Sequence, residues 1–104
     1  MGLIRGGGDK NSSMEVLPVN STNTIKRSST YAVDTSAAPV TLTVEEGAGI
    51  KSFAVFDSAG NFDAQPCYVV IGADTYVLDK KNKQYDFYYD GSSWRWSEIN
   101  KVVN

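Results

Sequence analysis

The chain has 104 residues and a formal net charge of −2; 41% of its residues are hydrophobic and 21% are charged. This length supports one domain with one core, and the slight acidic excess argues against the basic surface typical of nucleic-acid-binding domains. No run approaches the roughly 20 apolar residues of a membrane span, so we expect contact with neither nucleic acid nor a membrane.

Residues 1–29 are rich in Gly, Ser, Asn and Thr, and their few apolar residues are scattered. Such a segment does not build its own core, so we expect an extended anchoring arm, with a disordered tail as the alternative. It carries four basic and two acidic side chains, a net charge of +2, which leaves −4 for the rest. This asymmetry favours docking on an acidic partner surface, although ordinary solvated charges explain it equally well. The apolar residues expected to anchor the arm are Leu3, Ile4, Val16, Leu17, Val19 and Ile25.

Residues 30–104 contain short β-branched and aromatic runs separated by turn residues, the pattern of an all-β domain. No stretch shows the apolar spacing of an amphipathic helix. About seven short strands predict a small antiparallel β-sandwich or barrel-like domain. The expected strands, in chain order, are 31–33, 40–44, 50–56, 67–71, 75–78, 84–89 and 94–99.

Two of these strands are apolar on both faces. In residues 50–56, Val55 points away from Ala54 and Phe56, and residues 67–71 show the same pattern. An isolated two-layer domain normally leaves one face of an antiparallel sheet polar. We therefore give equal weight to burial of the second face against a further copy, a partner or the arm, and to a half-exposed surface lined by tyrosines.

The sequence contains no histidine and a single cysteine. Without histidine, neither a serine–histidine nor a cysteine–histidine dyad can form, and one cysteine does not provide a zinc site. Cys67 lies in an apolar run, where a buried hydrophobic role is expected. Aspartates such as Asp57 and Asp90 follow strands, which favours a role in turns over catalysis or calcium binding. We predict no catalytic residue, no metal and no cofactor, and hence a protein that is not an enzyme.

Aromatic residues gather at residues 85–96 around the sequence Asp90-Gly91-Ser92-Ser93, which predicts a hairpin. A hairpin that closes the core is the favoured role, because rings on paired strands can lie opposite one another. The alternative is an exposed platform for glycan or protein contact, with Tyr88, Trp94 and Trp96 as the candidate residues.

Three segments, taken in order, resemble small β-rich modules of bacteriophage virion proteins. Residues 29–44 are similar to a segment with tyrosine, aspartate and threonine followed by valine–threonine–leucine. Residues 49–61 resemble a strand that ends in aspartate, small residues and glycine–asparagine. Residues 87–94 are similar to a hairpin of the form aspartate–glycine–x–x–tryptophan. The chain departs from the family pattern between residues 61 and 78.

This resemblance implies a non-catalytic virion component, often trimeric. We expect a capsid decoration or head-fibre protein that its N-terminal arm anchors to capsid or tail subunits. Its location would be the virion, assembled in the cytoplasm of the bacterial host, and a homo-oligomer with a trimer favoured is expected. The alternatives are a tail-fibre or tail-adaptor subunit and a carbohydrate- or receptor-binding module.

Overall fold

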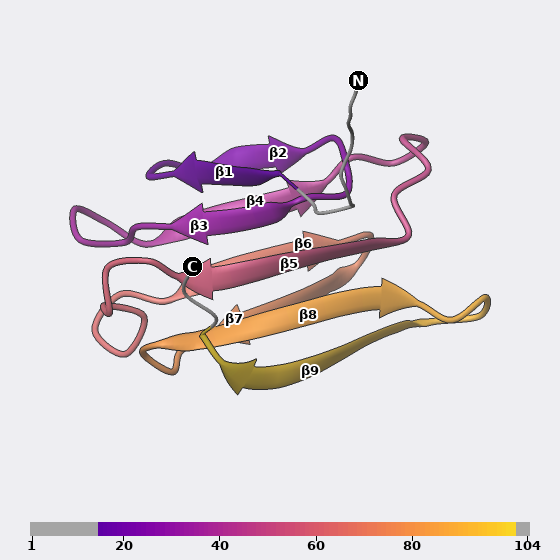
Figure 1. The fold of residues 1–104 in the computed structure, drawn as a ribbon. Coiled ribbons are helices and arrows are strands. Elements are labelled where there is room, and N and C mark those ends of the chain that lie inside the picture. Colours follow the sequence, from indigo (N-terminus) through magenta and orange to yellow (C-terminus); the bar gives the residue numbers. More distant parts are fainter. Residues whose placement is uncertain (1–14, 102–104) are drawn as a thin grey trace, which may run out of the picture.

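The computed structural model of the protein describes residues 15–101. These residues form nine strands and no helix, so the predicted all-β class is confirmed (Figure 1). Seven strands match the predicted ones to within two residues at their ends, and two further strands precede them. In chain order the strands are β1 (Val16–Val19), β2 (Asn23–Ile25), β3 (Thr30–Val33), β4 (Val40–Val44), β5 (Ser52–Asp57), β6 (Cys67–Ile71), β7 (Asp74–Leu78), β8 (Lys83–Tyr89) and β9 (Trp94–Asn100).

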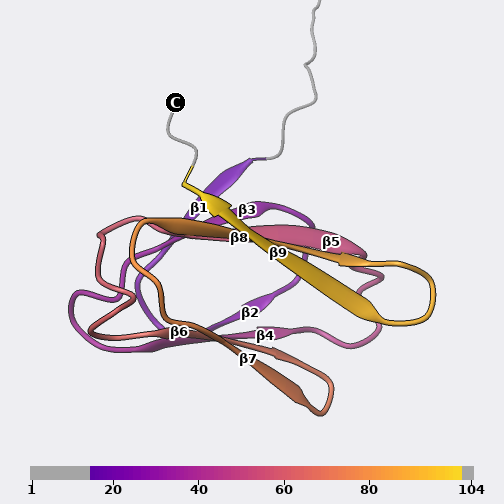
Figure 2. The same cartoon turned by 90° about the horizontal axis from the view of Figure 1, so that it is seen from below.

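The strands form two sheets that pack face to face (Figure 2). The first sheet has the order β1-β3-β5-β8-β9 and the second has the order β2-β4-β6-β7, and they do not close into a barrel. Apolar side chains from the two inner faces fill the space between the sheets. The largest fully buried side chains are Phe53 and Phe87 of the first sheet and Phe62 of the β5–β6 connection, and the rings of Phe53 and Phe87 stack with their centroids 4.9 Å apart.

The first six strands alternate between the two sheets and make three turns of a flattened coil. β1, β3 and β5 lie parallel in the first sheet, and β2, β4 and β6 lie parallel in the second. Parallel neighbours need a crossover connection, which here is the strand in the opposite sheet. The antiparallel sandwich expected from the sequence is therefore wrong in this half, because the short connections carry the chain across to the other sheet. Antiparallel pairing is confined to the pairs that include β7, β8 or β9.

The arm predicted over residues 1–29 is not confirmed where the structure describes it, because β1 and β2 belong to the two sheets. The backbone N–H of Asp34 donates to the carbonyl of Val19 at 2.8 Å, and that of Glu45 donates to the carbonyl of Ile25 at 3.0 Å. Val19 is 8% exposed and Ile25 is fully buried in the core. These scattered apolar residues could not form a core alone, but the neighbouring strands β3 and β4 supply the rest of it.

Asp57 ends β5 and fixes the loop that follows, as expected for a turn aspartate. Its buried carboxylate accepts hydrogen bonds from the backbone N–H groups of Gly60, Asn61 and Phe62, at 2.9–3.2 Å. A fourth backbone donor, Asn82 in the β7–β8 connection, is 3.0 Å away. One carboxylate thus joins two loops that are distant in the sequence.

Cys67 begins β6 and is fully buried, as predicted from its apolar neighbours. Burial raises the pKa of the thiol to about 12, and the negative charge of Asp57 adds to this shift. The thiol therefore stays protonated near neutral pH, which suits the packing role that the sequence predicts.

The hydroxyl of Thr35, in the connection between β3 and β4, is buried and has no hydrogen-bond partner among the described residues. Replacing Thr35 with valine keeps the branched shape and removes the unpaired hydroxyl, so we expect the free energy of unfolding to rise by about 1 kcal/mol. Thr35→Ser is the matched control, because it keeps the hydroxyl and loses the methyl group. Urea denaturation should show Thr35→Val above wild type and Thr35→Ser below it; a less stable valine variant would mean that the hydroxyl is hydrogen-bonded in solution.

Candidate functional site

One hollow lies between the two sheets where β1 and β2 form their free edges. It has a volume of about 460 Å³, within the range of ligand and anchor pockets. Residues of three strands, β1, β3 and β4, provide its apolar part. The apolar lining residues are Leu17, Pro18, Val19, Tyr31 and Leu42. We call this space the edge hollow.

The rim of the edge hollow is basic. Lys26 and Arg27 line it from the connection between β2 and β3. The Tyr31 hydroxyl donates to the carbonyl of Arg27 at 2.7 Å, which fixes this connection against the core. Burial raises the pKa of Tyr31, so its hydroxyl remains protonated and available as a donor. Arg27 also pairs with Glu15 at 3.1 Å across the surface, whereas Lys26 has no ion pair with any side chain of residues 15–101.

Backbone hydrogen bonding along β1 is directed toward β3. The carbonyls of Glu15 and Val19 accept from β3 and the residue after it. Because backbone groups alternate in direction along a strand, those of Val16 and Pro18 face the free edge. Proline has no N–H to donate, so β1 is a poor template for the addition of another strand. A partner would have to contact this end mainly through side chains and the edge hollow.

The predicted anchor residues are distributed over three environments. Leu3 and Ile4 lie outside the described residues. Val16 is 53% exposed, and Leu17 is half-buried in the edge hollow. Val19 and Ile25 pack in the core of their own chain, which leaves Val16 and Leu17 as the described anchor candidates with surface for a partner.

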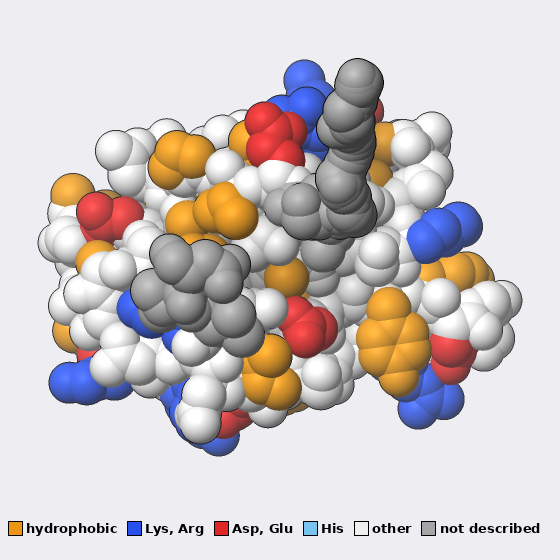
Figure 3. All heavy atoms as spheres, in the orientation of Figure 1, with side chains coloured by type: hydrophobic (Ala, Val, Ile, Leu, Met, Phe, Trp, Pro, Cys, Tyr) orange, Lys and Arg blue, Asp and Glu red, His pale blue; other side chains and the backbone are white. Residues whose placement is uncertain are grey.

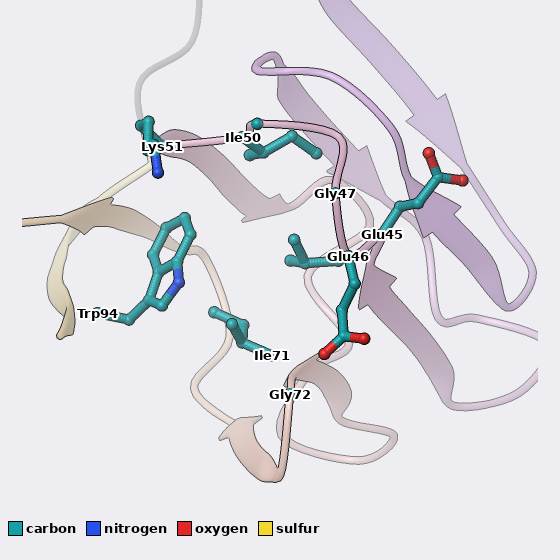
Figure 4. A pocket seen from close by; sticks show the side chains of 10 residues that line it. Glu45, Glu46, Gly47, Ile50, Lys51, Ile71, Gly72 and Trp94 are labelled. Atoms are coloured by element: carbon teal, nitrogen blue, oxygen red, sulfur yellow. The ribbon is translucent and has the colours of Figure 1, made fainter. Parts of the chain in front are cut away.

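A second hollow of about 410 Å³ lies at the ends of the strands, beside Trp94. We call it the Trp94 pocket. Figure 4 shows Trp94 and Lys51 on one side of it and the carboxylate of Glu46 on the other, with Ile71 between them. The carboxylate of Glu45 points away from Trp94 (Figure 4). The pocket is lined by Val44, Glu45, Glu46, Gly47, Gly49, Ile50, Lys51, Ile71, Gly72 and Trp94.

The connection between β4 and β5 forms one wall of the Trp94 pocket. It reverses through Gly47 and Gly49, whose φ values of 83° and 75° lie in the left-handed region that glycine adopts without strain. The carbonyl of Lys51 then accepts a hydrogen bond from the N–H of Tyr89 at 2.8 Å. The Lys51 ammonium lies 4.8 Å from the centroid of the Tyr89 ring, a cation–π contact that holds it at the rim.

The β8–β9 hairpin places Trp94. Asp90 accepts hydrogen bonds from the N–H groups of Ser92 and Ser93, both at 2.9 Å, and its other oxygen lies 2.7 Å from Nε of Arg95. Arg95 first, and then these N–H groups, hold the pKa of Asp90 well below its usual value. The indole of Trp94 packs against Phe53, with ring centroids 5.7 Å apart. The turn and the core together fix the aromatic wall of the pocket.

The structure does not place the three predicted recognition aromatics on one surface. Tyr88 is 48% exposed and lies on the outer face of the first sheet, opposite in direction to Phe87. Trp94 and Trp96 share the other face, but Trp96 packs against Tyr85 at 5.9 Å, away from the Trp94 pocket lining. The sequence identified Trp94, whereas Glu46, Lys51 and Ile71 come from loops and strand ends whose proximity depends on the fold.

The outer face of the first sheet is mixed in character. Ala54 is 3% exposed and Phe56 is half-buried, while Val16 and Ile99 are exposed. Figure 3 shows apolar side chains on the visible part of this face in separate groups, with charged and polar atoms between them. The outer face of β5, which carries Ala54 and Phe56, is thus partly covered by the neighbouring strands β3 and β8.

Within residues 15–101 there is no group of three or more acidic, cysteine or histidine side chains arranged to bind a metal ion. The same part of the chain contains no helix of the length and apolarity needed to cross a membrane.

No protein-family model matches the chain, and a search of curated proteins finds no significant relative.

Proposed function

We propose that the protein is a non-catalytic structural component of a bacteriophage particle, a capsid decoration or head-fibre protein attached through its N-terminal end. The observation that carries this proposal is the edge hollow. It lies at the end of the coil where no strand covers β1 and β2 among the described residues, and residues 1–14 of the sequence directly precede it. Leu17 and Pro18 keep accessible apolar surface there, which a capsid or tail subunit could bury by inserting an apolar side chain.

The charges support an acidic partner surface. The basic rim residues Lys26 and Arg27 lie at the edge hollow, while the chain as a whole carries a net charge of −2. Complementary charge speeds encounter and fixes orientation more than it adds affinity. The apolar hollow would then provide most of the affinity, with the half-buried Leu17 at its margin.

The resemblance to virion modules gives the proposal its biological setting. The three similar segments correspond in the structure to β3 with β4, to β5 with the Asp57 turn, and to the β8–β9 hairpin. These elements are strands and turns of the two sheets. The resemblance therefore supports a structural module of this class and does not point to a catalytic site. A homo-trimer in the assembled virion is the corresponding proposal for its oligomeric state, and light scattering of the purified protein tests it.

The attachment is tested in the phage that encodes the chain, by counting copies per purified particle with quantitative mass spectrometry. Lys26→Glu combined with Arg27→Glu should reduce the copy number about tenfold, because it reverses the rim charge while leaving the core intact. Lys81→Glu, which reverses the charge of one exposed lysine in the β7–β8 connection, is the control and should leave the copy number unchanged. Lys26→Glu alone, a single reversal at the rim, should still reduce it.

Absence of the chain from wild-type particles, or full occupancy by the rim variant, would contradict the proposal. Immunogold labelling of intact particles separates the two placements. Label on the head supports a decoration or head-fibre protein, whereas label on the tail supports the alternative of a tail-fibre or tail-adaptor subunit.

A further inference from the structure

The Trp94 pocket combines an aromatic wall, an aliphatic floor and charged groups of both signs. Trp94 forms the wall, and Val44, Ile50 and Ile71 provide the aliphatic surface. Glu46 faces the pocket from the side opposite Lys51. Ligand sites typically have this composition, in which apolar surface supplies affinity and a few polar groups fix orientation.

The charges around the pocket select the class of ligand. Glu46 disfavours an anion, whereas the Lys51 ammonium on the Trp94 side of the pocket disfavours a cation stacked on the indole. A neutral ligand avoids both repulsions. If it also carries hydroxyl groups, it can donate to the Glu46 carboxylate and accept from Lys51.

A pyranose sugar has these properties. One face of the ring exposes C–H groups that can pack on an indole, and its rim carries hydroxyl groups that donate and accept hydrogen bonds. We infer that the Trp94 pocket binds a single neutral hexose or N-acetylhexosamine unit of a glycan, with the sugar ring on Trp94 and its hydroxyl groups between Glu46 and Lys51. This inference goes beyond the proposed attachment through the edge hollow, and it gives the virion module a contact with a carbohydrate surface.

The pocket is pre-organised for such a ligand. Trp94 is held by tilted contacts with Phe53 and Tyr89, whose ring centroids are 5.7 and 5.9 Å away. Lys51 is held over Tyr89, so a sugar need not order it on binding. The open, shallow form of the hollow suits one sugar unit, for which we expect a dissociation constant of about 1 mM.

Isothermal titration of the full chain tests the inference with N-acetylglucosamine, glucose, glucosamine and glucuronate as separate probes. The neutral sugars should bind more tightly than the cationic glucosamine and the anionic glucuronate. Trp94→Leu should weaken binding about tenfold by removing the ring while keeping apolar volume. Glu46→Gln should weaken it less, and Tyr88→Leu, the matched change on the opposite face, should leave it within about twofold.

Wild-type backbone NMR shifts provide a second measurement that does not depend on the fold of the Trp94 variant. N-acetylglucosamine should perturb residues 44–51, 71–72 and 94, and leave residues 17–31 at the edge hollow unchanged. Lack of binding by both neutral sugars, stronger binding of a charged sugar, unchanged affinity in a folded Trp94→Leu variant, or shifts located elsewhere would each overturn the inference. None of these outcomes bears on the copy number in particles, so the attachment proposal is tested separately.

Discussion

Replacing Ile25 with alanine is expected to lower the free energy of unfolding by about 3 kcal/mol, the usual loss for a large aliphatic side chain in a tight core. Ile25 is fully buried in β2, where it lies beside Val44 of β4. An extended arm or a disordered tail would make the same substitution nearly neutral. The variant therefore measures directly whether residues 23–25 belong to the folded body.

Val16→Ala is the matched control for this measurement, because Val16 is 53% exposed in the neighbouring strand β1. Its effect should stay within about 0.5 kcal/mol, as for most exposed positions. Both values come from urea denaturation followed by far-ultraviolet circular dichroism. A small and equal change in the two variants would show that β2 does not pack in solution.

By the same reasoning, deletion of residues 2–28 should unfold the protein, since it removes two strands from the core.

Replacing Asp57 with alanine is expected to destabilise the protein by at least about 3 kcal/mol, because four backbone N–H groups lose their common acceptor. The donors belong to Gly60, Asn61, Phe62 and Asn82. Some of these N–H groups can turn toward water. Phe62, however, is fully buried, so its N–H can reach water only if the whole loop moves. In a domain of this size the loss corresponds to a fall in Tm of roughly 12 °C or more.

Asp57→Asn separates hydrogen bonding from shape. It keeps the volume of the side chain but replaces one acceptor oxygen with a donor group, which then faces N–H groups, so it should cost nearly as much as alanine. Asp63→Asn changes an exposed aspartate of the same loop and should be neutral. Thermal unfolding of the three variants gives the comparison. Stability close to wild type for Asp57→Asn would show that the two loops do not depend on this carboxylate.

The positions of seven strands could be predicted from the sequence because each carries a dense run of β-branched or aromatic residues bounded by turn residues. β1 and β2 have four and three residues and contain Pro18 and Asn23, which weaken the strand signal. They are strands because β3 and β4 offer them a partner edge and a core. That contribution is tertiary and has no local signature in residues 16–25.

The parallel coil could not be predicted for a related reason. A connection of six residues, such as 34–39 between β3 and β4, is compatible with a hairpin and with a crossing to the opposite sheet. The tightest hairpin connection in the structure is Gly72-Ala73 between β6 and β7, where the pairing is indeed antiparallel. In the coil, the amides of Asn61 and Gln65 donate to the carbonyl of Thr35 from about 30 residues away, and such contacts hold the crossing in place.

The candidate sites were predicted only in part. Trp94 is conspicuous in the sequence because it follows a hairpin turn in an aromatic cluster. Glu46 belongs to a glycine-containing segment that reads as a simple strand break, and Lys51 falls within the predicted strand 50–56. Only the packing of the two sheets brings them beside Trp94. The edge hollow is formed by residues of three strands and of the β2–β3 connection, so it becomes visible only when the end of the coil is known.

Pro18 has a consequence for the behaviour of the protein in concentrated solution. Among residues 15–101 no strand pairs with the outer edge of β1, and such an edge can pair with a strand of another copy. The missing N–H of Pro18 weakens pairing at that edge. Substituting Pro18 with valine restores a backbone donor there, so we expect the variant to associate more readily than wild type at high concentration.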